Sequence, residues 1–204
     1  MPIEPSYKIS FKHNSFLWLP FKTSSTTVSW ILGHFDFCNY TYDSVNEKYV
    51  EMYPSMFHLG HDMYLPPTHE QMNFICTMRN PYDIILSYFK MWCRQKNIQP
   101  KKNDFKENLE SFIFKNHLIS DLSKISQERK PNFILRTENL LEDLLKIPFI
   151  KDSKLNQCGI LEEMTQKKLN VSFPVDVDEL LDQDDKTKIY EMFKFHFDFF
   201  GYSR

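Results

Sequence analysis

The chain has 204 residues, of which 42% are hydrophobic and 25% are charged, and its net charge at pH 7 is −2. These values are typical of a globular protein. They exclude a disordered tail or a fibre, and the length suits one domain over residues 1–204 with a buried core. A nucleic-acid-binding protein that relied on its overall field would normally be basic, so we expect no nucleic-acid partner, and a bound anion must be held by a local site.

The sequence contains no predicted targeting or membrane segment. Met1–Phe16 is mixed polar and lacks the apolar centre of a secretory signal. No window approaches the run of about 18 apolar residues that a membrane span requires. The four cysteines include no C-x-x-C pair, which favours reduced, buried thiols over disulfides. We therefore expect a cytoplasmic protein with no membrane partner.

Strands and helices are predicted to alternate along the chain. Short apolar runs predict buried strands at 16–19, 56–59, 74–78 and 133–135. Apolar residues at helical spacing predict helices at 26–35, 80–92, 105–113, 140–146 and at the C-terminus up to Gly201. Residues 96–103 are predicted to form an exposed loop, and 151–175 show no clear pattern. The alternation predicts an α/β domain with a mainly parallel sheet, in which ligands bind beyond the carboxyl ends of the strands.

The segment after the first predicted strand has the chemistry to hold a phosphate. It reads Pro20-Phe21-Lys22-Thr23-Ser24-Ser25-Thr26-Thr27 and leads into a predicted helix. A helix N-terminus favours an anion, the hydroxyl side chains add donors, and Lys22 adds a positive charge. The alternative is an ordinary Ser/Thr-rich start of a helix. The segment is not a Walker A loop, because G-x-x-x-x-G-K-[S/T] is absent.

A second candidate anion site follows the strand at 74–78. Arg79 comes directly after this strand, where ligands bind in α/β sheets, and its planar fork suits a phosphate. Asn80 and Pro81 suit the cap and the first position of the next helix. Ser87 lies two turns into that helix and could donate to the same group. The alternative makes Arg79 a surface ion-pair partner and Ser87 an exposed residue without a role.

Together the two segments resemble the sulfotransferases that use 3′-phosphoadenylyl sulfate (PAPS). That family has a P-x-K-T-like loop for the 5′-phosphosulfate and an R-[N/D]-P-x-[D/E]-x-x-x-S motif for the 3′-phosphate. Leu135–Leu140 looks like its L-R-Y-E-[D/N]-L segment, Phe197–Tyr202 like its D-F-x-x-F-G-Y ending, and Asn170–Ser172 like an N-x-S segment near the donor. The matches occur in family order. Two positions depart from the family: the loop contains no Gly, and Thr137 stands where Tyr is usual.

The resemblance implies a fold, a reaction and roles for the candidate residues. The fold would be a three-layer, P-loop NTPase-like α/β domain with a central, mainly parallel sheet flanked by helices. The reaction would move a sulfuryl group from PAPS to a hydroxyl of a small molecule or glycan, leaving PAP, with no metal. Lys22 would stabilise the leaving phosphate. The 5′-phosphate would be held by Thr23, Ser24, Ser25, Thr26 and Thr27, and the 3′-phosphate by Arg79 and Ser87.

The base that would take the acceptor proton is predicted to be His61. This residue follows Gly60 in a G-H pair that resembles one in carbohydrate-type branches of the family, which favours a saccharide acceptor. A histidine titrates near neutral pH and can accept a proton from a hydroxyl. His58 and Glu70 are rivals for the role. A zinc site formed by His58, His61 and His69 is disfavoured because no cysteine or second cluster supports it.

Two other functions remain open at the level of sequence. One is a P-loop-type nucleotide kinase or hydrolase, which leaves the Arg79 helix unexplained. The other is a non-catalytic relative that binds PAP. Glu138 is read as structural, either orienting Arg136 or capping the next helix, and the aromatic C-terminal helix is read as core. The sequence predicts neither the acceptor nor the oligomeric state.

Overall fold

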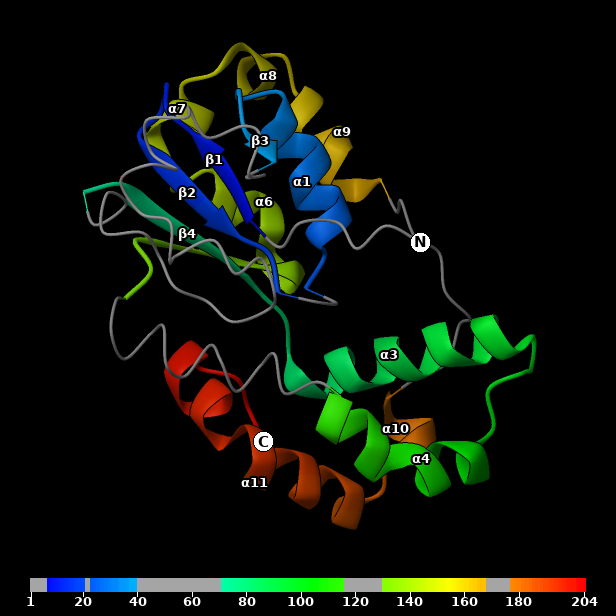
Figure 1. Cartoon of the computed structure of the whole chain (residues 1–204). Coiled ribbons are helices and arrows are strands. Elements are labelled where there is room, and N and C mark those ends of the chain that lie inside the picture. The colour runs from blue at the N-terminus through cyan, green and yellow to red at the C-terminus, as the bar shows by residue number, and fades with distance from the viewer. Residues whose placement is uncertain (1–6, 21–22, 40–70, 116–129, 168–176) are drawn as a thin grey trace, which may run out of the picture. The chain divides into compact units, whose positions relative to one another are not determined.

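A computed structural model describes residues 7–20, 23–39, 71–115, 130–167 and 177–204. The chain divides into two compact units, which are considered separately (Figure 1). The first comprises Met1–Met78 and Glu128–Leu169, and the second comprises Arg79–Gln127 and Asn170–Arg204. The sheet belongs to the first unit, and the described part of the second unit is helical.

The first unit contains a five-stranded open sheet in the order β3-β1-β2-β4-β5. Its strands are β1 (Tyr7–Ser10), β2 (Ser15–Trp18), β3 (Cys38–Asn39), β4 (Asn73–Met78) and β5 (Phe133–Arg136). The pairs β2·β4 and β4·β5 are parallel, whereas β1 pairs antiparallel with both β2 and β3. Among the described strands, therefore, β1 alone runs against the others. The prediction of an α/β chain with a mainly parallel sheet is confirmed.

The predicted strands at 16–19, 74–78 and 133–135 are β2, β4 and β5 within one residue at each end. The strand predicted at 56–59 lies outside the described residues. The sequence did not reveal β1 and β3. They are four and two residues long, too short for an alternating pattern to emerge, and pairing across the turn after Ser10 defines β1.

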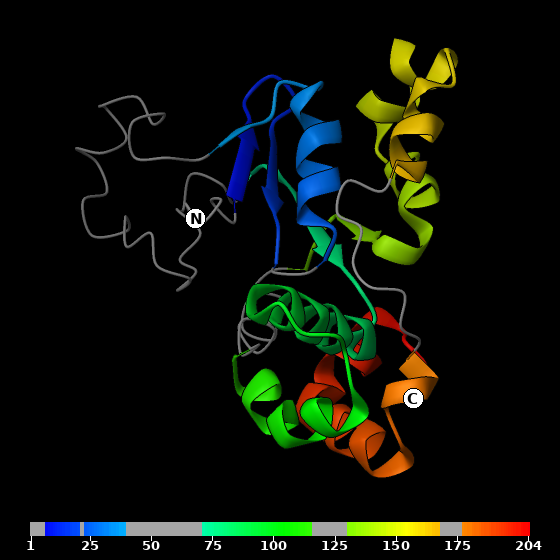
Figure 2. The same ribbon diagram turned by 90° about the vertical axis from the view of Figure 1, so that its right-hand side faces the viewer.

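One face of the sheet packs against helices of the first unit. These helices are α1 (Ser25–Gly33), the 3₁₀ turn η4 (Thr137–Asn139), α6 (Leu140–Leu144), α7 (Pro148–Lys151), α8 (Lys154–Gln157) and α9 (Ile160–Gln166). Leu17, Ile75 and Leu135 come from neighbouring parallel strands and share a buried cluster with residues of α1, α6, α7 and α9. Figure 2 shows α1 and the yellow helices on the same side of the sheet.

The opposite face of the sheet is also buried. It carries Phe16, Trp18, Phe74, Cys76 and Met78, all at most 4% exposed. A three-layer fold requires helices on both faces of the sheet. Within the described part of the first unit, the helices cover one face, so the coarse α/β class is established and the three-layer arrangement stays a prediction.

Residues 151–175 were predicted to lack a pattern, but their described part contains α8 and α9. Each is at most seven residues long, so neither spans enough turns for an apolar stripe to repeat. Local signals define the ends instead: the Ser153 side chain accepts a hydrogen bond from the Asn156 N–H, and Gly159 takes a left-handed conformation before α9. The helix predicted at 140–146 is shorter, because α6 ends at Leu144.

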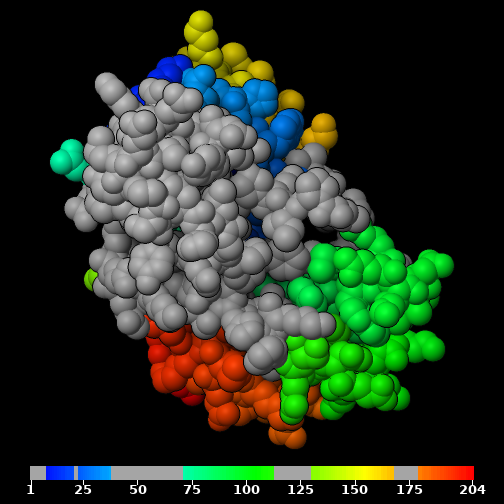
Figure 3. All heavy atoms as spheres, in the orientation of Figure 1, coloured from blue at the N-terminus to red at the C-terminus, as the bar shows by residue number. Residues whose placement is uncertain are grey.

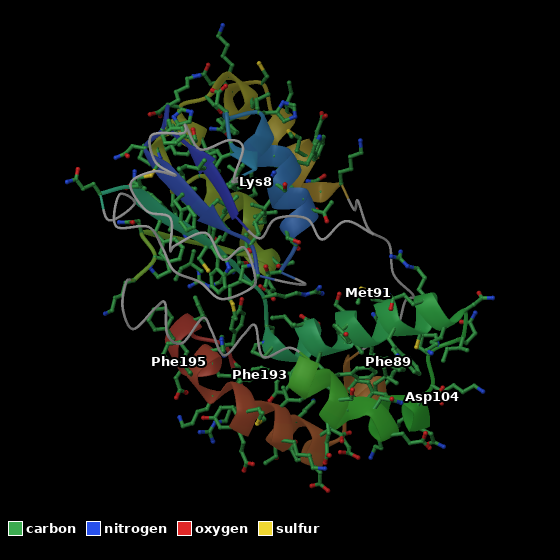
Figure 4. The ribbon with its side chains drawn as sticks, viewed as in Figure 1. Lys8, Phe89, Met91, Asp104, Phe193 and Phe195 are labelled. Atoms are coloured by element: carbon green, nitrogen blue, oxygen red, sulfur yellow. The ribbon has the colours of Figure 1, made fainter. Side chains whose placement is uncertain are left out.

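The second unit is built from α3 (Pro81–Lys96), α4 (Lys102–Lys115), α10 (Val177–Leu180) and α11 (Gln183–Phe200). In Figure 3 the green α3 and α4 and the orange to red α11 adjoin one another, and the three helices contact in pairs. Figure 4 labels Phe89 on α3 and Phe193 on α11, both of which are buried. Phe89 meets Phe105 edge-on with ring centroids 5.1 Å apart. Aromatic packing therefore holds this unit together.

The C-terminal helix confirms its predicted role as core. Ile189, Phe193, Phe197 and Phe200 are all buried, and Gly201 ends α11 in the left-handed conformation at φ 73°. The loop predicted at 96–103 is shorter than expected, since α3 continues to Lys96 and α4 begins at Lys102.

The structure bears on the predictions about buried cysteines and membrane-spanning segments. Cys76 and Cys93 are buried free thiols, but Cys158 is exposed, so burial was wrong for that residue. No helix within the described ranges has both the length and the hydropathy to cross a bilayer.

Candidate functional site

The carboxyl ends of β2, β4 and β5 lie at one edge of the sheet. The three strands are parallel neighbours, with Trp18 opposite Cys76 and Met78 opposite Arg136. From this edge β2 leads through Leu19 and Pro20 toward the first candidate loop, and β4 leads directly into Arg79. Topology therefore starts both predicted anion-binding segments from adjoining strand ends, where ligands bind in α/β sheets.

The first loop is attached to β4 by a pair of buried hydroxyl groups. Thr23 and Thr77 are 1% and 0% exposed, and their Oγ1 atoms are 2.6 Å apart. Thr23 Oγ1 also donates to the Pro20 carbonyl at 2.7 Å, and the Thr23 N–H donates to the same oxygen at 3.4 Å. A hydroxyl has one proton and a carbonyl only accepts, so the donor in the threonine pair must be Thr77. The hydrogen bonds therefore run from Thr77 to Thr23 to Pro20.

This bonding changes the role expected of Thr23. Its hydroxyl and its N–H are both engaged within the protein, and the side chain is buried. Thr23 therefore shapes the loop and offers no exposed hydroxyl to a phosphate.

Ser24 adopts the left-handed conformation, with φ 59° and ψ 26°, and precedes α1 without making a side-chain capping bond. A residue with a Cβ is strained by about 1–2 kcal/mol in this region, whereas glycine is not. Serine therefore occupies a left-handed position of this loop that glycine would favour.

The start of α1 is suited to an anion. Ser24, Ser25, Thr26 and Thr27 are half-buried, and the first turn contains no acidic residue. The first N–H groups of a helix lie beyond the reach of its own carbonyl ladder, and the helix dipole is positive at this end. The combination offers backbone and hydroxyl donors with no carboxylate in that first turn to repel a phosphate.

Arg79 carries a hydrogen-bond donor that no described residue engages. Its Nε is buried and has no hydrogen-bond partner among the residues that the structure describes, although the side chain as a whole is 28% exposed. The Asp83 carboxylate forms an ion pair with Arg79, as the alternative interpretation predicts, but at 4.0 Å from Nε it lies beyond hydrogen-bonding distance. A buried, unsatisfied guanidinium nitrogen is costly, so it is a natural place for an anionic ligand.

The helix after Arg79 begins as the sequence predicts. Pro81 is its first residue, and the Asn80 side chain accepts a hydrogen bond from the Tyr82 N–H at 3.0 Å. Asp83 and the half-buried Ser87 are four residues apart within α3, so they share a face of this helix. The helix start is confirmed, and the pairing of Arg79 with Ser87 at one ligand stays a prediction.

Polar groups at the carboxyl end of β5 form hydrogen bonds and ion pairs within the protein. Arg136 donates through its backbone N–H to the buried Asp143 at 2.8 Å, and its guanidinium lies 3.4 Å from the same carboxylate. Lys146 completes the cluster at 2.6 Å from Asp143. Asp143 therefore orients Arg136 through both its backbone and its side chain. The Thr137 hydroxyl donates to the Met78 carbonyl at 3.2 Å, which gives this departure from the family pattern a role of its own.

Several predicted site residues lie outside the described residues. They are Lys22, His58, His61 and Glu70, together with the segment 170–172. Among the described residues no cluster of three or more histidines, cysteines or carboxylates could hold a metal. Burial raises the pKa of the Cys76 thiol far above its ordinary value, so this residue is no candidate nucleophile.

Comparison with models of protein families, with curated proteins and with solved structures finds no match to this chain. The resemblance to sulfotransferases therefore rests on the motifs alone, and the function must be inferred from the residues and geometry of the chain.

The sequence pattern does not single out two functional residues of this region, Thr77 and Asp143. Thr77 was read as part of an apolar strand, although a threonine in a buried strand must find a partner for its hydroxyl. Asp143 lies in the helix predicted at 140–146, and the sequence gives it no role of its own. The partner of Thr77 is Thr23, 54 positions away, and the partner of Asp143 is Arg136, seven positions away. The spacing of residues in the sequence therefore identifies neither pair.

Proposed function

We propose that the protein is a PAPS-dependent sulfotransferase that transfers a sulfuryl group to an acceptor hydroxyl. The observation that carries this proposal is the Thr77–Thr23 hydrogen bond, which attaches the loop before α1 to the strand that continues into Arg79. The Nε of Arg79, which has no hydrogen-bond partner in the described part of the chain, supports it independently. A nucleoside with phosphate groups at both its 5′ and 3′ positions requires two such anion-binding segments.

Each segment has its own part in the proposed reaction. Backbone and hydroxyl donors from Ser24 to Thr27 bind the 5′-phosphate at the start of α1. Arg79 and Ser87 bind the 3′-phosphate, which distinguishes this donor from ATP. Positioning of the donor lowers the barrier to in-line transfer, so the proposed reaction depends on both sets of residues.

Two further residues provide the chemistry. PAPS supplies the sulfuryl group. Lys22 stabilises the charge that grows on the leaving phosphate oxygen as its bond to sulfur breaks. His61 takes the proton of the acceptor hydroxyl as the new sulfur–oxygen bond forms. A sulfuryl group carries less charge than a phosphoryl group, so the proposed reaction needs no metal. The glycine–histidine pair at 60–61 favours a saccharide acceptor.

A ligand comparison separates this proposal from the alternatives. In a thermal-shift titration, PAP should stabilise the protein more than ADP or Mg·ATP. At a ligand concentration of about 100 times Kd, we expect a rise in Tm of roughly 5 °C or more. Stabilisation by Mg·ATP with no response to PAP would instead identify a nucleotide kinase or hydrolase. Stabilisation by PAP without sulfate transfer to any acceptor in a broad screen would identify a non-catalytic relative.

A further inference from the structure

The residue Thr77 has a hydroxyl that strand β4 does not need for its own packing. Its side chain is fully buried between Cys76 and Met78 in the chain, and a valine has nearly the same shape and suits a strand equally well. Burying a hydroxyl is unfavourable unless it forms a hydrogen bond. The bond to Thr23 therefore accounts for this hydroxyl, and it serves the loop and not the strand.

The loop that is hydrogen-bonded to Thr77 contains a strained residue, Ser24. Ser24 follows Thr23 directly and takes the left-handed conformation in spite of its Cβ. A strained residue keeps its conformation when its neighbours determine it. On one side, Thr23 is bound to Pro20 and Thr77, and on the other side the Ser24 carbonyl accepts the Val28 N–H at 3.0 Å. These bonds determine the backbone at the start of α1.

We propose that Thr77 is a positioning residue for the 5′-phosphate. Resting on the proposed function, the inference is that Thr77 acts through Thr23 to keep the N-terminus of α1 in the conformation that binds the anion. Thr77 itself touches no ligand, because its side chain is buried and its proton is committed to Thr23. The hydrogen-bond chain links β4 to the donors that recognise the nucleotide.

The test compares two nucleotides on a small set of variants. Thr77→Val removes the hydroxyl and keeps the shape, whereas Thr77→Ser keeps the hydroxyl. The affinities for PAP and for adenosine 5′-phosphosulfate, which has no 3′-phosphate, are measured by calorimetry together with Tm. Thr77→Val should weaken both nucleotides by a similar factor, about tenfold, since one buried hydrogen bond is lost. Thr77→Ser should keep the affinities of the parent chain.

Ser10→Ala is the matched control. Ser10 is also a buried hydroxyl residue of the sheet, and its Oγ donates to the Phe35 carbonyl at 3.4 Å. It pairs with Ser15, the first residue of β2, and therefore lies at the opposite edge from the loop. Ser10→Ala should lower Tm without changing either affinity. A merely structural role for Thr77 would give this same pattern.

The outcomes separate the inference from the proposed function. If the parent chain binds PAP and Thr77→Val binds both nucleotides equally well, the inference is wrong and the function stands. A loss confined to PAP would move the effect to the 3′-phosphate and would also overturn it. A parent chain that binds neither nucleotide overturns both. If Thr77→Val does not fold, Thr23→Val with Thr77→Val removes both hydroxyls, and the same loss of affinity is expected from this double variant.

Discussion

The two proposed anion-binding segments differ in how their polar groups are arranged for a phosphate. In the segment 20–27, polar groups bond within the protein: Thr23 uses both its N–H and its hydroxyl, and Thr77 donates to it. In the segment 79–87, Arg79 keeps a buried nitrogen without a hydrogen-bond partner among the described residues. The described part of the first segment is therefore held by hydrogen bonds within the protein, whereas the second segment offers a donor that no described residue engages.

The two segments therefore recognise an anion by different physical means. A backbone cradle recognises an anion only if its N–H groups already point in the right direction, so its strength depends on conformation. A guanidinium recognises an anion through charge and a planar fork, so its strength depends on the side chain itself. Variants of the first segment should therefore act through geometry or chemistry at the 5′ side, and variants of the second through affinity for the 3′-phosphate.

The largest effect is expected at Lys22. Lys22→Ala should lower kcat by about 100- to 1,000-fold, the usual cost of removing one donor that stabilises a transition state. His61→Ala should also abolish transfer while PAP affinity is retained, because a base does not contact the product nucleotide. Both are measured by steady-state sulfate transfer together with PAP calorimetry. Full turnover of His61→Ala would move the base to another residue, with His58 and Glu70 tested next.

Arg79→Ala should have the next largest effect. It should weaken PAP by about 10- to 100-fold, as expected for hydrogen bonds to a charged group, and should leave adenosine 5′-phosphosulfate nearly unaffected. Arg94→Ala is the control, since Arg94 lies exposed in the last turn of the same helix. Equal losses for the two nucleotides would contradict the role of Arg79 at the 3′-phosphate and remove the contrast between the segments.

Substitutions at Ser24 should give the smallest effect and sharpen the contrast further. Ser24→Val places a β-branched residue at positive φ and should lower the free energy of unfolding by about 1–2 kcal/mol. Ser24→Gly should be neutral or stabilising by less than about 1 kcal/mol, because relief of strain offsets the added freedom of the unfolded chain. Ser29→Val, further along α1, is the matched control. Denaturant titration measures all three, and equal effects of glycine and valine would show that the left-handed turn is unimportant.

Much of the fold could be predicted because its signals are local. The apolar runs of β2, β4 and β5, the Asn80-Pro81 helix start and the Gly201 helix end each depend on a few adjacent residues. The short elements β1, β3, α8 and α9 could not be predicted, because pairing and packing stabilise them more than their own sequence does. In the same way, the sequence predicted that a carboxylate could orient Arg136, but the structure was needed to find Asp143 as its partner.

The order of residues is enough to locate the two chemically distinctive segments, since their hydroxyls, lysine and Arg-Asn-Pro helix start are contiguous. Which of those groups already have partners follows from the three-dimensional packing. It engaged Thr23 with a threonine 54 positions away and left the Nε of Arg79 without a hydrogen bond among the described residues. The physical reason is that availability depends on partners in space, and parallel strands bring together residues that sequence spacing keeps apart.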